Sequence, residues 1–313
     1  MPQSSYSPKM TSIGGQAVLE GIMMRGPIES ALSVRRPDGT IITETWKTNK
    51  KPLPWYRKTP FIRGVFQFVD TLIVGYKTLM RSAELSGSLE EEEPSKFDQW
   101  LEKKFGDKVT TILGTVVSLL AVCLALFLFM FLPSLFTKWL GAFVPLNGWM
   151  SVIEGLIKIL IFVAYVFFCS RLKEIHRVFQ YHGGEHKCIF CYEAGLPLTI
   201  ENVRKQKRFH PRCGTSFLLI VLILGILVSS IVTWDSLLLR VLLKIITLPI
   251  VCSVSYEIIK LAGRCQNPFT RAISAPGMWL QRLTTQEPDD RQIEVAITAL
   301  NAVIPEDPNL DSL

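Results

Sequence analysis

The stretch YHGGEHK, residues 181–187, and the stretch FHPRCG, residues 209–214, are polar islands between long apolar segments. In chain order, the apolar segments are Val109–Leu132, Trp149–Cys169, Ser216–Thr233 and Leu237–Lys260. Each segment reaches or approaches the ~20 residues that an α-helix needs to cross a bilayer. We therefore predict four transmembrane helices, with both polar stretches in the loop between the second and the third.

The composition favours a membrane protein with water-exposed parts. Of the 313 residues, 49% are hydrophobic and 19% are charged, and the mean hydropathy is +0.30. Such a chain is too apolar for an ordinary soluble protein and too charged to lie inside a bilayer throughout. The lipid bilayer is therefore the first predicted partner.

The distribution of basic residues predicts the orientation. The net charge is +7, and the basic residues gather in the loop at 171–215 and in the tail at 261–313. Basic loops stay in the cytoplasm, so both termini and the central loop are predicted to be cytoplasmic. The seven cysteines then predict no disulfide framework, because that compartment is reducing. No basic stripe with interleaved aromatic residues is present, so nucleic acid is not a predicted partner.

The predicted fold class is a mainly α membrane protein with four transmembrane helices. A small cytoplasmic α/β region is formed by the N-terminal segment, the central loop and the C-terminal tail. The predicted parts are a cytoplasmic N-terminal segment with a β-hairpin (1–60), an interfacial amphipathic helix with an acidic linker (61–108), a first transmembrane pair (109–170), the cytoplasmic loop with the His/Cys cluster (171–215), a second transmembrane pair (216–260) and the cytoplasmic tail (261–313).

Local signals support the soluble parts. Asp38-Gly39 between two β-branched runs, near residues 31–36 and 41–45, is typical of a tight hairpin. Residues 61–85 have apolar side chains at helical spacing, but charges interrupt them, so we predict a helix that lies on the membrane. In the tail, Asp289 or Asp290 is a predicted N-cap for a short amphipathic helix.

Four charged residues fall inside the predicted spans. Glu154 and Lys158 are four positions apart in the second span, and Arg240 and Lys244 have the same spacing in the fourth. Charged side chains in a bilayer are expensive and often functional. Here all four lie toward the same predicted end of their helices, so we expect them to pair in a structural role.

The motif His182-x-x-Glu185-His186 matches the inverted zincin pattern. On a helix, two histidines four positions apart face the same way and can share a cation, with Glu185 beside them as a general base. Such a site needs a third ligand. The candidates are His210, Cys213 and Glu257. The glycines between the histidines disfavour a helix and could instead form a turn.

Two other interpretations compete for the same residues. The pairs Cys188-x-x-Cys191 and His210-x-x-Cys213 have the spacing of a closed structural zinc site, which would need no catalysis. Alternatively, Arg212 could lower the pKa of the neighbouring Cys213 thiol and make it a nucleophile.

Several motifs resemble the YqhQ-like family of bacterial multipass membrane proteins. They are GGQAVLEGIMMRGP at 14–27, HGGEHK at 182–187, HPRCGTSF at 210–217 and RLTTQEP at 282–288. The resemblance covers roughly residues 12–300. Family members typically have Gly-Ala where this chain has Gly183-Gly184, and Cys188 and Cys191 are not hallmark positions.

The resemblance implies a bacterial plasma-membrane protein and a predicted metal-dependent enzyme without an established reaction. The motif positions that it favours for a site are His182, Glu185, His186, His210 and Cys213.

We carry two functional hypotheses. The first is a membrane-embedded, hydrolase-like enzyme in which His182, His186, His210 and Cys213 supply ligands to a divalent metal, zinc, and Glu185 is the catalytic base. The second is a non-catalytic accessory protein that binds a translocation or insertion complex, with any metal structural. An enzyme needs an open coordination position with Glu185 aimed at it, whereas an accessory protein needs an exposed apolar patch for its partner.

Overall fold

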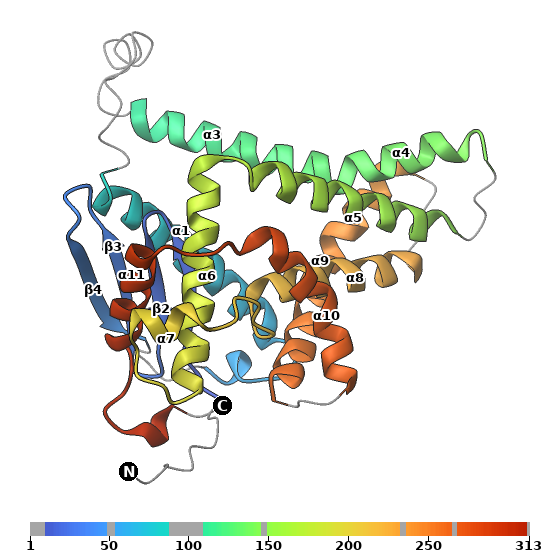
Figure 1. Ribbon diagram of the computed structural model, residues 1–313. Coiled ribbons are helices and arrows are strands. Elements are labelled where there is room, and N and C mark those ends of the chain that lie inside the picture. The colour runs from blue at the N-terminus through green and yellow to red at the C-terminus, as the bar shows by residue number, and fades with distance from the viewer. Residues whose placement is uncertain are drawn as a thin grey trace. The chain divides into compact units, whose positions relative to one another are not determined.

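The computed structural model describes residues 10–48, 54–87, 109–144, 149–231, 236–264 and 268–311 (Figure 1). The predicted acidic linker, with Glu90–Glu93, lies outside the described residues. The chain divides into two compact units. One comprises residues 1–88, 166–220 and 252–313, and the other comprises residues 89–165 and 221–251.

The first unit contains a four-stranded antiparallel sheet. Its strands are β1 (Gly14–Val18), β2 (Gly21–Arg25), β3 (Glu29–Arg35) and β4 (Ile41–Lys47), in the order β1-β2-β3-β4. The predicted hairpin is β3–β4, where Arg35 pairs with Ile41 and Gly39 adopts a φ of +88° in the turn. The sequence did not predict β1 and β2, whose small and methionine-rich residues give a weak strand signal.

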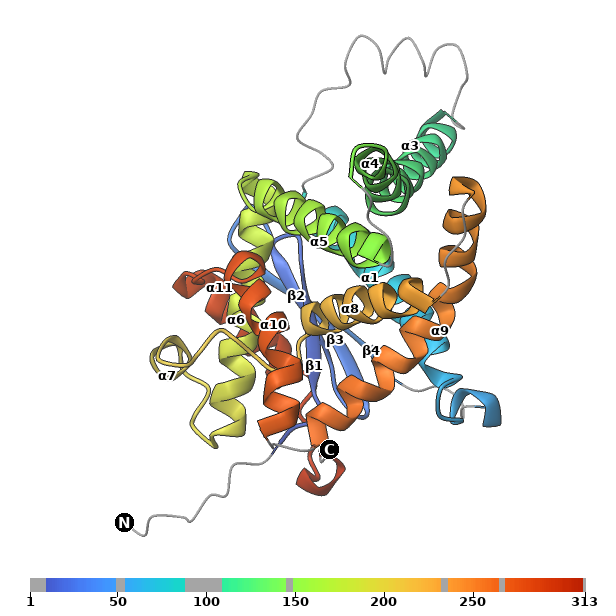
Figure 2. The same ribbon diagram turned by 90° about the vertical axis from the view of Figure 1, so that its right-hand side faces the viewer.

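Helices cover both faces of this sheet (Figures 1 and 2). The helices of the unit are α1 (Arg63–Leu85), α6 (Lys173–Glu193), α7 (Ile200–Arg204), α10 (Pro268–Thr284) and α11 (Asp290–Asn301), with short 3-10 turns η1 (Trp55–Arg57) and η5 (Pro308–Leu310). Because successive side chains of a strand point to opposite faces of the sheet, hydrophobic residues pack on both faces. Ile22 and Met24 pack with α6 and α11, whereas Met23 and Leu32 pack on the side of α1.

The helix predicted at 61–85 is α1. Its buried positions include Gly64, where a Cβ would come within 2.7 Å of the Ser253 Cα, and Thr78 beside the sheet. Along its other side Leu72, Ile73 and Tyr76 are exposed. The helix is therefore amphipathic, as its spacing predicted, with an apolar side that nothing in the described chain covers.

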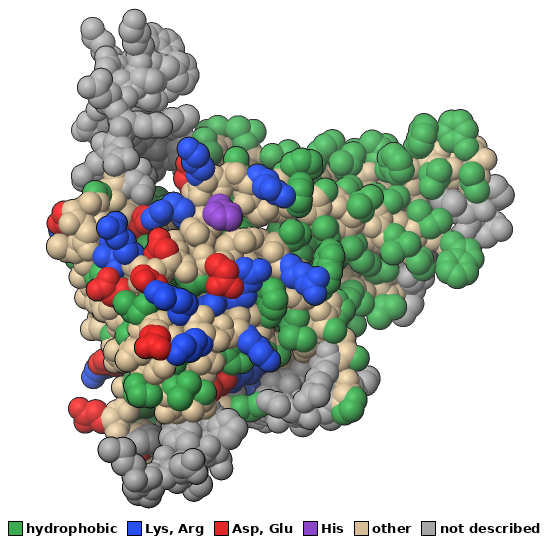
Figure 3. Space-filling model, viewed as in Figure 1, with side chains coloured by type: hydrophobic (Ala, Val, Ile, Leu, Met, Phe, Trp, Pro, Cys, Tyr) green, Lys and Arg blue, Asp and Glu red, His purple; other side chains and the backbone are tan. Residues whose placement is uncertain are grey.

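Among the described residues, three helices are long and apolar enough to cross a membrane: Thr115–Gly141, Met150–Cys169 and Val241–Leu261. The elements in these regions are α3 (Val109–Leu126), the π-helical turn η3 (Phe127–Phe131), α4 (Leu132–Gly141), α5 (Met150–Cys169) and α9 (Leu237–Arg264). The helix α8 (Gly214–Ile231) covers the remaining predicted span, but its apolar stretch Gly214–Val228 is shorter. Four spans are thus not confirmed. Hydrophobic side chains cover α3, α4 and α5 (Figure 3).

The second unit holds a buried ion pair. Glu154 of α5 pairs with the ammonium of Lys244 of α9. The Ser134 hydroxyl donates to the Glu154 carboxylate at 2.5 Å and accepts from the Lys244 ammonium at 3.0 Å. Two of the four charged residues thus pair directly between two helices, and Ser134 of α4 is hydrogen-bonded to both. The side chain of Arg240 lies outside the described residues.

Hydrogen bonds to the end of the tail hold the N-terminal segment in place. The buried Asp311 carboxylate accepts hydrogen bonds from the Thr11 hydroxyl at 2.7 Å, the Ser12 backbone N–H at 2.8 Å and the Tyr192 hydroxyl at 3.0 Å. Burial alone would raise the pKa of Asp311, but these hydrogen bonds lower it below the usual 3.8. In α11, Asp289 is the N-cap and forms a capping box with Gln292, as the sequence predicted.

We expect Asp311→Asn to destabilise the protein by ~1–3 kcal/mol at neutral pH, because it removes charge-assisted hydrogen bonds. The difference from wild type should be complete above the unfolded-state pKa and should vanish as the pH falls through the lower folded-state pKa. Thermal unfolding in detergent at several pH values measures it. Asp307→Asn, at an exposed position, is the control, and an equal effect in both variants would contradict the proposed tie.

Candidate functional site

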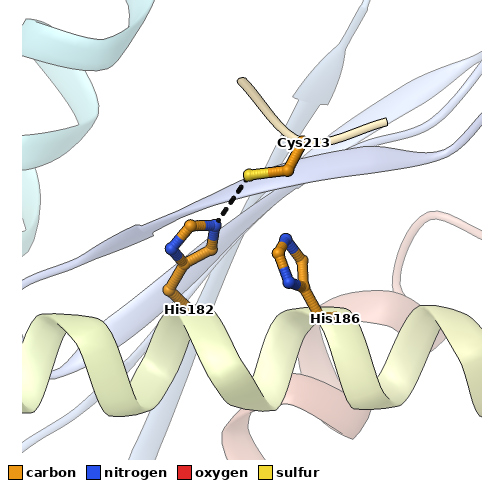
Figure 4. A group of neighbouring side chains, drawn as sticks. All are labelled: His182, His186 and Cys213. Atoms are coloured by element: carbon orange, nitrogen blue, oxygen red, sulfur yellow. Dashed lines mark hydrogen bonds between the residues drawn. The ribbon is translucent and has the colours of Figure 1, made fainter. Parts of the chain in front are cut away.

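Helix α6 carries three of the predicted site residues. His182, Glu185 and His186 lie on one side of it, and the two imidazole rings are 4.4 Å apart between centroids. Both histidines project toward Cys213, which precedes α8 (Figure 4). The glycine pair between them is helical, so the helical interpretation of the motif holds and the alternative of a turn at Gly183-Gly184 is wrong.

Close packing explains the first glycine. A Cβ at Gly183 would lie 1.9 Å from the Gln286 carbonyl oxygen. In the same place the Gln286 N–H donates to the Phe179 carbonyl of α6 at 2.8 Å. The segment after α10 therefore lies directly on the backbone of α6, and only glycine allows this approach. At Gly184 the nearest atom is 3.6 Å from a Cβ, which is ordinary contact, so alanine fits there.

Two backbone carbonyls hold the histidines. His182 Nδ1 lies 2.8 Å from the Thr284 carbonyl oxygen, and His186 Nδ1 lies 2.6 Å from the Arg208 carbonyl oxygen. A carbonyl can only accept, so each Nδ1 carries a proton and donates it. The Nε2 atom of each ring is then the one available to a metal, an arrangement typical of metal-binding histidines in proteins.

Cys213 completes a compact group. Its Sγ is 3.2 Å from His182 Nε2, and the ligand atoms of His182, His186 and Cys213 all lie within 4.8 Å of one another. Thr215 in the first turn of α8 donates to this sulfur from its backbone N–H at 3.5 Å and from its hydroxyl at 3.3 Å. Both the donors and the helix N-terminus stabilise a thiolate.

The charges in this group are coupled. Burial opposes ionisation of Cys213, but electrostatic attraction and hydrogen bonds from His182 and His186 hold the pKa of its thiol well below the usual 9.0. Burial also opposes a charge on His182, but the Cys213 thiolate and its hydrogen bond raise the pKa of His182 to about 9. The site thus favours positive charge beside the thiolate, and His182, His186 and Cys213 are the residues that would hold a metal cation.

Glu185 lies beside the group with one oxygen free. Its Oε1 accepts the Gly15 N–H of β1 at 3.1 Å, whereas its buried Oε2 has no hydrogen-bond partner among the described residues. Burial raises the pKa of Glu185, and the attraction of the neighbouring His182 and His186 opposes this only in part. The carboxyl group lines a cavity of about 490 Å³ together with both histidines and Cys213. A carboxyl group with one unpaired oxygen beside such a cavity is suited to hold or move a proton.

His210 is not part of the converging group. Its Nδ1 accepts the Arg212 backbone N–H at 3.3 Å, and its Nε2 is 3.8 Å from Glu193 Oε2. The Gln281 side-chain amide binds both the N–H and the carbonyl of His210 at 2.7 Å. Glu193 also pairs with Arg212. His210 therefore lies in a buried polar network beside the cavity, with its ring 5.6 Å from that of His186.

The closed Cys/His site does not form among the described residues. Cys188 and Cys191 are fully buried in the core between the sheet, α6 and α11. Burial raises the pKa of the Cys188 thiol, as expected for an inert core cysteine. The other proposed ligand, Glu257, pairs instead with Arg63 at 2.5 Å. The sequence thus left three candidates for the third ligand, and Cys213 is the one that joins both histidines.

Sequence reasoning missed the supporting residues. Gly15 and Thr284 were each named only as part of a family motif. Their roles depend on backbone groups, which carry no side-chain signal.

Two imidazoles and a thiolate are donors that zinc prefers, and a cavity beside them leaves room for a fourth ligand. The residues therefore fit a divalent metal of this kind.

The adjacent glycines allow a matched test of the packing. We expect Gly183→Ala to destabilise the protein strongly and to displace His182, because the methyl group overlaps the Gln286 carbonyl. Gly184→Ala should be neutral or stabilising by up to ~1 kcal/mol, since alanine is the better helix former. Thermal unfolding in detergent compares the two variants. Equal stability of both would contradict the close approach.

Comparisons with known proteins agree with the resemblance seen in the motifs. The chain is 37% identical over 295 residues to the "Uncharacterized protein YqhQ" of Bacillus subtilis (strain 168), covering 93% of this chain and 92% of that protein. No solved structure matches the chain. Residues 59–306 match the family described as "Protein of unknown function (DUF1385)". The chain therefore belongs to the DUF1385 family, together with YqhQ.

Proposed function

We propose that this protein is a membrane-embedded, metal-dependent hydrolase. One observation carries the proposal: His182, His186 and Cys213 converge, with both Nδ1 atoms hydrogen-bonded to backbone carbonyls, beside a cavity that Glu185 also lines, and one buried oxygen of Glu185 has no partner among the described residues. A purely structural metal site would need neither an open cavity nor an unpaired carboxylate. This arrangement therefore favours an enzyme over the accessory-protein hypothesis.

The residues of the site would bind the metal, orient the ligands and transfer the proton. His182, His186 and Cys213 hold the metal, and the carbonyls of Thr284 and Arg208 orient the two rings. A divalent zinc ion at this position would polarise a carbonyl or phosphoryl oxygen and activate water. Glu185 accepts the proton of the attacking water at Oε2 and returns it to the leaving group. The Gly15 N–H keeps the other oxygen, Oε1, in place.

The raised pKa of Glu185 suits this role. A general base works best when its pKa lies near the working pH, and burial moves a carboxyl group in that direction. Gly15 is a positioning residue for the base, and its lack of a side chain is required. A Cβ there would lie 2.5 Å from the Met23 carbonyl oxygen and 3.2 Å from Glu185 Cδ.

We place the protein in the bacterial plasma membrane with four spans. The helix α8 has 18 residues, about 27 Å at 1.5 Å per residue, which approaches the ~30 Å of the hydrocarbon core. Four spans return both termini to the same side, and the basic residues of the central loop and tail put that side in the cytoplasm. The bilayer is the first partner, and the exposed apolar side of α1 would lie on it.

Metal content tests the proposal. We expect the untagged wild type, purified in detergent, to contain close to one zinc per chain by mass spectrometry. His186→Ala and Cys213→Ser should lose it, because each removes one of three ligands. Cys191→Ala, which changes a core residue of α6 outside the metal-binding group, should keep it. Glu185→Gln should also keep the metal but lose hydrolysis of lipid and peptide substrates in nanodiscs by about a hundredfold or more, as expected for a general base.

Controls separate folding from chemistry. Each variant is compared with wild type by thermal unfolding with and without a chelator. If no metal copurifies and none binds on addition, the metal-dependent hydrolase is refuted. Metal loss in Cys191→Ala together with retention in His186→Ala would instead support a structural site.

A second chemistry has its own support in the same residues. The 3.2 Å contact between His182 Nε2 and Cys213 Sγ, with a lowered thiol pKa, is also the geometry of a cysteine nucleophile and its base. Iodoacetamide distinguishes the two. A nucleophile should be alkylated at Cys213 with or without chelator, whereas a metal ligand should react only after the metal is removed.

A further inference from the structure

A second cavity of about 750 Å³ lies in the same unit, between the sheet and α1. The residues that matter here are Arg25 at the end of β2, Gln67 and Thr71 of α1, Tyr256 of α9, and Thr48. Among the described residues that line this cavity, none is an aspartate or a glutamate, whereas two are arginines. Its lining is therefore positively charged.

Arg25 gives the cavity an unpaired charge. Strand alternation places Arg25 on the same side of the sheet as Met23, the side that faces α1. Within the described chain, its guanidinium has no hydrogen bond and no salt bridge. Arginines in clefts are usually paired, and the planar guanidinium is well suited to bind a phosphate or carboxylate with two parallel hydrogen bonds.

Neutral donors face the same space. In the described part of the protein, neither the Gln67 side-chain amide nor the Tyr256 hydroxyl has a hydrogen-bond partner, and both line the cavity. Thr71 adds a hydroxyl, which donates within α1 to the Gln67 carbonyl at 2.8 Å. One free guanidinium, one amide and one phenol give several donors without a competing carboxylate. This donor set is complementary to a tetrahedral oxyanion.

The two cavities share a wall. Residues Ser12, Gly14, Gly15 and Gln16 line both, as does Arg212. Arg212 is already engaged by Glu193 and by the Thr11 carbonyl at 2.8 Å, so it fixes the wall. A molecule with its anionic group at Arg25 could therefore extend past the edge of β1 toward Glu185 and the His/Cys group.

We propose that the Arg25 cavity binds the phosphate group of the substrate while the group to be hydrolysed lies at His182, His186 and Cys213. The assignment of this anion to the substrate rests on the proposed function, but the anion site itself rests on the lining residues alone. A membrane lipid is the favoured source of the phosphate. Tyr256 lies near the end of the candidate span Val241–Leu261, and α1 supplies the opposite wall. Tyrosine is typical of the membrane–water boundary, where lipid phosphates lie.

Binding by the full-length protein in detergent tests the anion site without requiring catalysis. Isothermal titration calorimetry with dihexanoylphosphatidic acid, dihexanoylphosphatidylcholine and inorganic phosphate separates the possible sources. We expect the phosphatidic acid to bind best. Arg25→Gln should weaken its binding by about tenfold to a hundredfold, the loss expected for a charge-assisted hydrogen-bonded pair. Arg36→Gln removes the same charge from an exposed position outside the cavity and should leave binding unchanged.

Each outcome has a defined meaning. Arg25-dependent binding of inorganic phosphate with the same affinity as the lipid would keep the anion site but refute the lipid source. Binding that is unaffected by Arg25→Gln, or equally weakened by Arg36→Gln, would overturn the site.

His186→Ala keeps this test distinct from the proposed function. It should abolish metal binding and hydrolysis yet leave phosphatidic acid binding intact. If Arg25→Gln retains the wild-type zinc content and melting temperature while losing lipid binding, a folding defect cannot explain the loss.

Discussion

The contact between Gly183 and the Gln286 carbonyl is the constraint on which the site depends. It lets an extended segment of the tail lie on the backbone of α6, closer than any side chain would permit. At the end of α10, directly before this segment, the Thr284 carbonyl accepts from His182 Nδ1 and so determines that Nε2 faces Cys213. Helix propensity disfavours two glycines in the middle of α6. Tertiary packing overrides that preference because the close approach supplies hydrogen bonds that no other residue at 183 would allow.

The site is assembled from segments that are distant in sequence. Helix α6 supplies the histidines and Glu185, the start of α8 supplies Cys213, and β1 supplies the Gly15 N–H that holds the carboxylate. Backbone groups do much of the positioning, through the carbonyls of Thr284 and Arg208. Backbone groups are held by secondary structure and vary little with sequence, so they orient ligands with less rotational freedom than side chains would.

The sequence predicted those features that have a local signal. The Asp38-Gly39 hairpin, the Asp289 cap and the amphipathic α1 follow from short patterns, and the structure contains all three. Strands β1 and β2 were not predicted, because glycine and methionine at positions 14, 15, 23 and 24 lack β-branched side chains. Pairing with neighbouring strands, rather than intrinsic propensity, keeps these two strands in the sheet.

For the site, the residue types in the two motifs were sufficient to name the candidates but not to choose among them. Cys213 and His210 are three positions apart, and their sequence context does not distinguish a ligand from a residue of a neighbouring network. The difference comes from Gln281 and Glu193, which bind His210 from α10 and α6. Long-range contacts of this kind have no signature in a single sequence. Arg25 has no such signature either, because the cavity that it lines exists only where α1 packs against the sheet.

The tie between Thr11 and Asp311 has a consequence for biogenesis. The two residues are 300 positions apart, so at 5–20 residues per second the ribosome needs about 15–60 s to make the second after the first. The hairpins of the sheet are local and can form early. However, the face of the sheet that carries Ile22 and Met24 packs against α11, and α11 is not made until near the end of that interval. Before then α6 can cover only part of this face, and an incompletely covered apolar face is prone to aggregate until the tail has been made.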